Sequence, residues 1–344
     1  MKNLVDKLIK ERTLTKSEWI KLIDARADVF GYVRKKAVET SLDSFGNKIY
    51  IRGLIELTNY CKNDCYYCGI RKSNKNCTRY RLSYEQIMSC CENGYPLGFR
   101  TFVLQGGEDT FFSDDFMCNI ISDIKQNYPD CAVTLSLGER SYESYKRLFD
   151  AGADRYLLRH ETACDEHYSR LHPALLSLEN RKKCLYNLKQ IGYQVGTGFM
   201  VGSPYQTSEN LAQDMMFMHE LMPHMVGIGP FIPHEQTPFR DMAAGSLELS
   251  VFMLALCRLM LPKALIPATT ALATVNKDGR KEGILSGANV IMPNLSPIDT
   301  RKNYLLYNNK AYNNEEAAEG LEKLKKSMEE INYEIICDRG DYKK

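Results

Sequence analysis

The stretch "IRGLIELTNYCKNDCYYCGIR" (51–71) joins a short apolar run to a loop that holds three cysteines. The run "IRGLIEL" (51–57) has the length of a β-strand, and turn residues follow it. The loop spaces Cys61, Cys65 and Cys68 as C-x3-C-x2-C, with no obvious fourth partner beside them. Before this stretch the pattern is helical, and after it short apolar runs alternate with amphipathic helical stretches. The alternation predicts an α/β fold that starts at this strand.

Eight strands are predicted from such runs, at 51–57, 100–105, 132–137, 154–159, 194–201, 224–229, 264–269 and 289–293. Seven helices are expected between them, near 83–94, 114–127, 141–151, 178–191, 208–221, 247–261 and 278–286. Strict alternation of strand and helix requires a parallel sheet, and eight such units match a closed (β/α)8 barrel of the TIM type. An open, doubly wound sheet is the alternative.

Three parts of the chain are expected. Residues 1–50 form an N-terminal helical extension, residues 51–305 form the barrel, and residues 306–344 form a C-terminal helical tail packed on the outside of the barrel. The extension contains "TKSE" (15–18), the sequence of a capping box at a helix start. The tail contains an amphipathic helix at 315–331.

The composition is ordinary for a soluble globular protein, with 44% hydrophobic and 26% charged residues. The formal net charge of +2 indicates neither a nucleic-acid partner nor a membrane-surface partner. The N-terminus lacks the apolar core of a signal peptide, and the most apolar run (251–262) is too short to span a bilayer. The chain is therefore expected in the cytoplasm, where its 12 cysteines stay reduced.

Polar and glycine residues gather where the predicted strands end. In a (β/α)8 barrel, chemistry occurs at the carboxyl ends of the strands. These ends read "QGGED" (105–109), "LGE" (137–139), "LLRHET" (157–162), "PATTA" (267–271) and "IMPN" (291–294). Their convergence on one rim is what a cofactor site requires.

Several of these residues also have a purely structural interpretation. Gly106 and Gly107 can simply make a tight turn between strand and helix. Arg159 and Glu161 lie two apart on an extended segment, so they share a face and can form a structural ion pair. His160 points away from both neighbours and is expected to be structural.

Three interpretations of the cysteine loop are open. A structural zinc site needs four ligands, so the loop would have to recruit Cys77 from the charged loop that follows. An iron–sulfur cluster in which the protein binds every iron also needs Cys77 as its fourth ligand. A [4Fe–4S] cluster on Cys61, Cys65 and Cys68 alone leaves one iron open for an outside ligand. The last interpretation is favoured because it explains the three cysteines of the loop without a fourth ligand from elsewhere in the chain.

The cysteine spacing at the end of the first strand resembles the signature of the radical S-adenosylmethionine (SAM) enzymes. Tyr67 before the last cysteine and the "GGE" turn (106–108) after the next strand strengthen the resemblance. The resemblance implies that the open iron binds the amino and carboxylate groups of SAM. An electron from the cluster then cleaves a C–S bond and yields a 5'-deoxyadenosyl radical. The cofactors carry this chemistry, while the protein orients them and excludes water and oxygen.

Further segments narrow the resemblance to the HydE family of [FeFe]-hydrogenase maturases. They are "VLQGGED" (103–109), "VTLSLGE" (133–139), "GADRYLLRHETA" (152–163), "MVGIGPFIPH" (225–234), "IPATTA" (266–271) and "GANVIMPN" (287–294). Biotin synthase and methylornithine synthase are similar more loosely. The resemblance implies a substrate that is an iron complex with cysteinate, carbonyl and cyanide ligands, used to build the diiron subcluster of the hydrogenase. It also implies transient contact with other maturases and with a reductase.

The resemblance assigns roles to matching positions, none of them catalytic beyond the cluster and SAM. The cluster ligands are Cys61, Cys65 and Cys68. The positions that border or hold SAM are Tyr67, Gly106, Gly107, Glu108, Ser136, Glu161, Arg181 and Met200. The positions that receive an anionic, cysteine-bearing substrate are Thr134, Arg159, Thr269, Thr270 and Met292.

Some members of the family carry a second cluster on three cysteines near the C-terminus. Here the matching stretch (308–326) contains none, and Cys337 stands alone, so a single cluster is predicted. Two other functions stay open: a related radical SAM synthase with a small organic product, such as a methylornithine-like isomerisation, and a non-catalytic iron–sulfur or zinc protein that acts as a scaffold or carrier. The pair "RHET" (159–162) and "PATT" (267–270) favours the maturase.

Overall fold

Six parallel strands form the largest sheet, in the spatial order β2, β3, β4, β5, β6 and β8. The computed structural model describes residues 1–311 and 317–343 of the chain. All neighbouring strands in the sheet are parallel, as expected when helices connect them. The strands are β2 (Gly53–Thr58), β3 (Thr101–Gly106), β4 (Ala132–Ser136), β5 (Arg155–Leu157), β6 (Gln194–Thr197) and β8 (Met225–Val226).

Backbone hydrogen bonds close this sheet into a barrel. The residues after β8 continue the ring through the segment 264–269 and through β10 (Val290–Ile291) back to β2. The closing bonds include Val226 N–H to the Leu265 carbonyl (3.1 Å), Ala268 N–H to the Val290 carbonyl (2.9 Å) and Leu54 N–H to the Pro293 carbonyl (2.9 Å). The predicted (β/α)8 barrel is confirmed, and the open doubly wound sheet is wrong.

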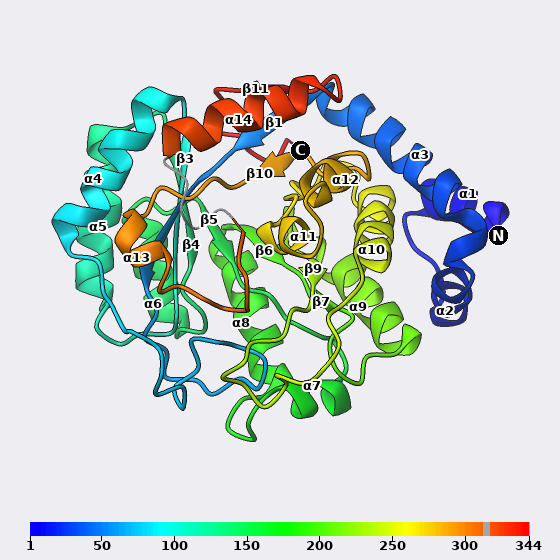
Figure 1. Ribbon diagram of the computed structural model, residues 1–344, viewed down its shortest axis with the longest axis horizontal. Helices are drawn as coiled ribbons and strands as arrows, with labels where there is room; N and C mark the ends of the chain where they lie inside the picture. Colours follow the sequence, from blue (N-terminus) through cyan, green and yellow to red (C-terminus); the bar gives the residue numbers. More distant parts are fainter. Residues whose placement is uncertain (312–316, 344) are drawn as a thin grey trace.

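Helices surround the strands on the outside of the barrel (Figure 1). The seven predicted helices are present as α4 (Tyr84–Gly94), α5 (Asp114–Asn127), α6 (Tyr142–Asp150), α8 (Leu178–Ile191), α9 (Ser208–Leu221), α10 (Leu247–Met260) and α12 (Gly279–Ile284). The first six begin after a serine or threonine whose side chain accepts a backbone N–H of the first turn. This bond satisfies a donor that the helix itself leaves unpaired.

Some predicted strands are shorter or interrupted. The run 264–269 makes only isolated bridges, and Pro267 within it has no N–H to donate. The runs 194–201 and 224–229 are each split, and their second halves pair with each other as β7 (Met200–Val201) and β9 (Gly229–Pro230). The short elements that the sequence pattern did not predict are η1 (Tyr95–Leu97), α7 (Asp165–Leu171), α11 (Thr270–Val275) and α13 (Ile298–Arg301).

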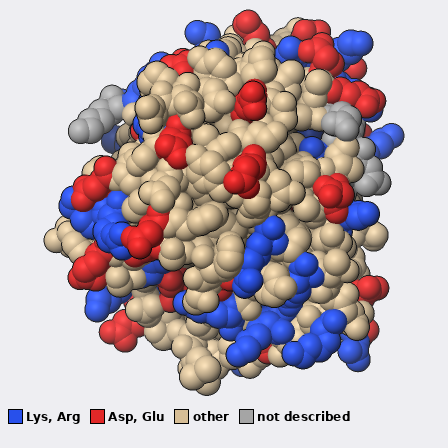
Figure 2. Space-filling view, turned by 90° about the vertical axis from the view of Figure 1, so that its left-hand side faces the viewer, with Lys and Arg blue, Asp and Glu red and all other residues tan. Residues whose placement is uncertain are grey.

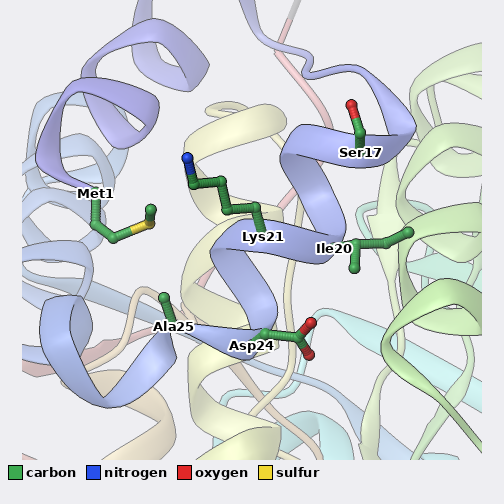
Figure 3. Close-up of a pocket in the computed structure, with 6 residues that line it drawn as sticks. All are labelled: Met1, Ser17, Ile20, Lys21, Asp24 and Ala25. Atoms are coloured by element: carbon green, nitrogen blue, oxygen red, sulfur yellow. The ribbon is translucent and has the colours of Figure 1, made fainter.

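The N-terminal extension consists of α1 (Lys2–Glu11), α2 (Lys16–Asp24) and α3 (Arg26–Phe45), which pack on α9 and α10. The predicted capping box is present, with reciprocal bonds between Thr15 and Glu18. These helices carry a hollow of about 620 Å³. Figure 3 shows the residues that line it: Met1, Ser17, Ile20, Lys21, Asp24 and Ala25. This hollow is large, but it lies away from the strand ends and holds no cysteine or histidine. No helix within the described ranges is long and apolar enough to cross a lipid bilayer.

The C-terminal segment packs beside the amino end of the barrel, near the top of Figure 1. α14 (Ala317–Glu329) lies within the predicted amphipathic helix and buries Leu321, Leu324 and Met328. Beyond it, β11 (Glu334–Ile336) pairs in parallel with β1 (Lys48–Ile51). Neither of these two strands was predicted, because each is short and pairs with a segment from the other end of the chain.

An ion pair anchors the last residues to the start of β5. Arg155 is fully buried and donates to Asp341 Oδ1 (2.6 Å), to the Arg339 carbonyl (2.8 Å) and to Thr101 Oγ1 (2.9 Å). Burial alone would raise the pKa of Asp341, but the charge and hydrogen bond of Arg155 lower this pKa to about 2. The pair therefore stabilises the folded chain while Asp341 is ionised.

Replacing Asp341 with asparagine is expected to lower the free energy of unfolding by about 1.5–3 kcal/mol near neutral pH, the range for a hydrogen bond to a charged group. Because the folded pKa lies below the unfolded one, this stabilisation is complete above about pH 4 and is lost as the pH falls toward the folded pKa. Thermal unfolding of both proteins between about pH 7 and about pH 3 measures the difference.

The matched control is Asp150→Asn, which removes an exposed pair with Lys146 on α6. This change is expected to alter the free energy of unfolding by less than about 1 kcal/mol. A difference between Asp341→Asn and the parent that stays constant over the whole pH range would contradict the role given to Asp341.

Candidate active site

Side chains that bond to the backbone fix the path of the cysteine loop. The loop leaves the carboxyl end of β2 and continues to α4. Asn59 is fully buried and donates to the carbonyls of Thr78 (2.8 Å) and Asn303 (2.7 Å). Arg79 donates to the carbonyl of Ile70 at 2.8 Å. A segment with almost no regular secondary structure is thus tied to the fold at both of its ends.

The turn after β3 passes directly against the cysteine loop. The N–H of Gly107 donates to the carbonyl of Thr58 at 3.1 Å. A Cβ at position 107 would lie 2.1 Å from the carbonyl oxygen of Tyr60 and 2.9 Å from the Cβ of Cys61. Neither Gly106 nor Gly107 has a positive φ. Close approach of two backbones, rather than a left-handed turn, therefore requires glycine at position 107.

A cavity of about 340 Å³ lies at the carboxyl ends of the strands, against the cysteine loop. The predicted site residues that line it are Cys61, Cys65, Cys68, Tyr67, Gly106, Gly107, Glu108, Ser136, Glu161, Arg181, Met200, Arg159, Thr269 and Thr270. Thr134 and Met292 do not line it. Thr134 precedes Ser136 by two residues on β4 and so lies deeper on the same face. Met292 packs against an apolar cluster that includes Met225 and Val290.

The three cysteines are half-buried, and their thiols are neutral unless a cation binds. Burial raises the pKa of Cys61, raises that of Cys65 to about 12 and raises that of Cys68 well above its usual value. Mutual repulsion of the charged forms adds to the shift at Cys65 and Cys68. A bound metal removes this penalty because it favours the thiolate.

The arrangement of the donors fits an iron–sulfur cluster. Within residues 1–311 and 317–343, no three His, Cys, Asp or Glu side chains converge on the position of a single ion. Zinc, with Zn–S bonds of about 2.3 Å, requires such convergence. In a [4Fe–4S] cluster the thiolates bind separate irons and stand further apart. The Sγ atom of Cys77 lies 3.4 Å from Asn59 Nδ2, and Cys77 does not line the cavity. This placement favours three ligands without Cys77.

Two ion pairs involve charged residues of the cavity. Arg159 Nη2 lies 3.1 Å from Glu161 Oε2, so the expected ion pair forms. Arg181 Nε lies 2.8 Å from Glu139 Oε1, and Glu139 Oε2 accepts a hydrogen bond from Asn180 at 2.6 Å. The two glutamates and two arginines that line one cavity, Glu108, Glu161, Arg159 and Arg181, match a ligand with both an ammonium and a carboxylate group.

His160 lies behind the cavity and is structural, as predicted. It is fully buried, with Nδ1 2.9 Å from Thr197 Oγ1 and Nε2 3.3 Å from Asp214 Oδ1. The expectation of an extended segment at this position is wrong. Glu161 has a φ of +65°, and the N–H of Thr162 bonds to the carbonyl of His160 at 2.8 Å. The chain therefore makes a tight turn at Glu161.

Thr269 presents a hydroxyl that has no partner in the described part of the protein. It occupies the N-cap position of α11, yet its side chain makes no capping bond. A Cβ at Gly229 would lie 2.7 Å from this hydroxyl, so glycine at 229 leaves space beside it. A buried hydroxyl without a partner costs about 1–3 kcal/mol. The cost is offset if a polar ligand binds in the cavity.

Several residues of the site were missed from the sequence. Tyr304, Leu306 and Tyr307 line the cavity although they follow the last strand. Their segment is anchored by Lys310, whose Nζ lies 2.5 Å from Glu56 Oε1 with both side chains buried. A carboxylate inside an apolar strand needs a partner, so Glu56 was the one signal of this contact.

Basic side chains are concentrated at the end of the molecule that carries the cysteine loop. The loop lies near the lower edge of Figure 1, and Figure 2 shows Lys and Arg gathered over the lower part of the adjacent face. The exposed basic residues of the loop are Lys62, Lys72, Lys75 and Arg81. Two of them are paired with acidic residues, Lys62 with Glu108 and Arg81 with Asp109. Lys72 and Lys75 are the exposed lysines near the loop that form no ion pair within the described part of the chain.

Known proteins resemble the chain along most of its length. The profile of the Radical SAM superfamily matches residues 55–218. The chain is 45% identical, over 273 residues, to the [FeFe] hydrogenase maturase subunit HydE of Thermotoga maritima, which covers 79% of this chain and 78% of that protein. It is 29% identical, over 265 residues, to 3-methylornithine synthase of Methanosarcina acetivorans, with 76% and 74% of the two chains covered.

Solved structures agree with the observed barrel. Methylornithine synthase superposes with a TM-score of 0.84 at 25% identity and covers 96% of this chain and 97% of its own. The hydrogenase maturase HydG superposes with a TM-score of 0.79 at 20% identity, over 97% of this chain and 75% of that chain, which shows the shared fold alone. Given the cysteine loop, the cavity and the 45% identity over most of both sequences, the chain belongs to the HydE family of radical SAM enzymes.

Proposed function

We propose that this chain uses a [4Fe–4S] cluster and SAM to act in the assembly of the active-site diiron subcluster of [FeFe]-hydrogenase. The observation that carries the proposal is the 45% identity to HydE over 79% of the chain. The cavity supports it, because three cysteines, two glutamates and two arginines line one space. The radical SAM family implies both cofactors.

The cluster would be held by Cys61, Cys65 and Cys68. When bound, the cluster and SAM supply an electron transfer that cleaves a C–S bond and produces a 5'-deoxyadenosyl radical. Glu161 and Arg181 would hold the charged and hydroxyl groups of SAM, since a carboxylate accepts from ammonium or ribose hydroxyls and a guanidinium donates to a carboxylate. Other residues of the cavity wall would border SAM: Tyr67, Gly106, Gly107, Glu108, Ser136 and Met200.

The remaining walls exclude water from the reaction. Leu157, Phe231, Leu306 and Tyr307 give part of the cavity an apolar surface. Removal of water strengthens the electrostatic contacts inside the cavity and protects a reactive intermediate from side reactions. The Lys310–Glu56 pair keeps the segment that carries Leu306 and Tyr307 in place.

The substrate in this proposal is an anionic iron complex with cysteinate, carbonyl and cyanide ligands. Arg159, Thr269 and Thr270 supply a guanidinium and two hydroxyl groups to receive it. Thr134 and Met292 lie deeper in the barrel and contribute only if the substrate extends below the cavity. Delivery of this complex requires another maturase, and repeated turnover requires a reductase, so transient contacts with both belong to the proposal.

The single cluster is a further part of the proposal. No cysteine occurs within 308–326, and Cys337 is exposed and alone. Residues 312–316 of that stretch lie outside the described residues.

A second candidate function is a synthase with a small organic product, and the observation in its favour is the TM-score of 0.84 to methylornithine synthase. Hydrogenase activation by the purified protein, in the presence of the other maturases, distinguishes the two functions.

Cys65→Ala is expected to abolish cluster binding, because each of the three thiolates holds one iron. Anaerobic reconstitution followed by iron analysis should give about four irons per chain for the parent and nearly none for the variant. Cys77→Ser is the matched control and should retain the iron content and the change in EPR signal on addition of SAM. Loss of the cluster in Cys77→Ser would show that the ligand set includes this residue.

Glu161→Ala is expected to weaken SAM binding by about 2–5 kcal/mol, at least about 30-fold, since a buried charged hydrogen bond loses one partner. Arg159→Lys should keep SAM affinity within about threefold, because a positive charge stays beside Glu161, but should impair hydrogenase activation by losing the planar guanidinium fork. Equilibrium binding of SAM to the reconstituted protein and hydrogenase activation separate the two effects. If both variants lost only SAM affinity, the division between cofactor and substrate residues would be wrong.

A further inference from the structure

Glu161 holds a backbone conformation that its surroundings must enforce. Six non-glycine residues in the described part of the chain have a positive φ, and Glu161 is the one among them that lines the cavity. The bond from Thr162 N–H to the His160 carbonyl closes a three-residue γ-turn around it. Such turns with positive φ are rare and strained, and they persist only where the neighbouring structure holds them.

The residue before the turn is fixed by a buried network on the outer side of the strand. The Oγ1 atom of Thr197 donates to the carbonyl of Leu158 at 3.0 Å. Its single proton is therefore engaged, so it accepts a hydrogen bond from His160 Nδ1 at 2.9 Å. The ring of His160 also packs against Phe199 and Phe217. These contacts leave the His160 ring one orientation.

The residues after the turn are fixed independently. Thr162 is fully buried, and its hydroxyl lies 3.0 Å from His167 Nδ1 on α7. The other ring nitrogen of His167 lies 2.9 Å from the carbonyl of Pro204, which can only accept. The N–H of Ala163 donates to Asp214 Oδ1 at 2.5 Å.

Asp214 connects the two sides of the turn. The same Oδ1 atom that accepts from Ala163 lies 3.3 Å from His160 Nε2, a contact that is not a hydrogen bond in the described part of the chain. Asp214 is fully buried on α9 and does not line the cavity. We propose that Asp214 is a positioning residue that clamps the γ-turn from outside the barrel and so holds Glu161 toward SAM.

The chemistry of Asp214 favours this role over that of an ordinary core residue. Burial raises its pKa and lowers that of His160, and Asp214 Oδ2 has no partner among the described residues. A buried polar pair is often no more stabilising than apolar residues of similar volume. Its value lies in fixing one geometry, and the geometry it fixes here is that of the residue proposed to bind SAM. The inference therefore rests on the proposed role of Glu161.

The test compares Asp214→Ala with Asp214→Asn in the reconstituted protein. Asparagine keeps the acceptor for Ala163 N–H, so SAM affinity should stay within about twofold of the parent. Alanine removes both contacts, and SAM affinity should fall about tenfold while the iron content is unchanged, the scale seen when outer-shell partners are removed. Equal SAM affinity in the parent and Asp214→Ala would overturn the proposal.

A second readout needs neither cofactor. In the protein without cluster, hydrogen exchange should accelerate in a peptide that spans residues 158–164 of Asp214→Ala, because the Thr162 and Ala163 amides lose their protection. The matched control is Asn289→Ala. Asn289 Oδ1 also bridges two donors, Arg258 Nη2 and Ile266 N–H, each at 2.9 Å, and is buried. Asn289→Ala should lower thermal stability without changing SAM affinity. If Asn289→Ala lost as much SAM affinity as Asp214→Ala, the proposed role of Asp214 would be overturned.

A double-mutant cycle separates this inference from the proposed function. If Asp214 acts through Glu161, Asp214→Ala should change SAM affinity by less than about twofold in a Glu161→Ala background. If the losses of SAM affinity in the two single variants instead multiplied in the double variant, the proposed role of Asp214 would be overturned. If Glu161→Ala alone left SAM affinity unchanged, the proposed role of Glu161 would fail instead.

If Asp214→Ala did not fold, Thr197→Val, which removes the acceptor of His160 Nδ1, would serve in its place.

Discussion

The parallel register of β2 with β3 is the constraint on which the site depends. Thr58 pairs with Gly106, so the cysteine loop and the turn after β3 leave the sheet at the same level. Their backbones come so close that a Cβ at Gly107 would lie 2.1 Å from the Tyr60 carbonyl oxygen. Because the sheet closes into a barrel, the ends of β4 and β5 face the same space. One register thus brings thiols, backbone amides and charged side chains around a single cavity.

The parts of this structure that depend on local sequence could be predicted. Helix positions followed from apolar periodicity and from serine or threonine N-caps, and the proposed cluster ligands rest on a spacing within eight residues. Contacts between segments that are far apart in the sequence could not be predicted. Lys310 and Glu56 are 254 positions apart, and nothing near either residue identifies the other. The γ-turn at Glu161 was also missed, because the apolar run before it indicates only a strand, and the buried side chains that hold the turn come from α7, β6 and α9.

Buried charged and polar groups divide into two sets along the barrel. At the amino end, Arg258 is fully buried and donates to backbone carbonyls and to Asn289, and burial lowers its pKa to about 9. Arg155 ties the C-terminal residues to β5 at the same end. At the carboxyl end, Glu56 and Asp214 each hold a segment that borders the cavity. Such groups contribute little net stability compared with apolar residues, but they fix which segments meet and at what position.

Two departures from local rules lie at the carboxyl rim, at Thr269 and at Glu161. Seven other helices in the described part of the chain begin after a serine or threonine, and all seven use that side chain as a cap. Thr269 has the same position on α11 but leaves its hydroxyl unpaired beside the cavity. Glu161 accepts a left-handed backbone that glycine would adopt more readily. Thr269 lacks the capping hydrogen bond, and Glu161 lacks a favourable backbone conformation. A polar ligand bound in the cavity that both residues line would offset this cost.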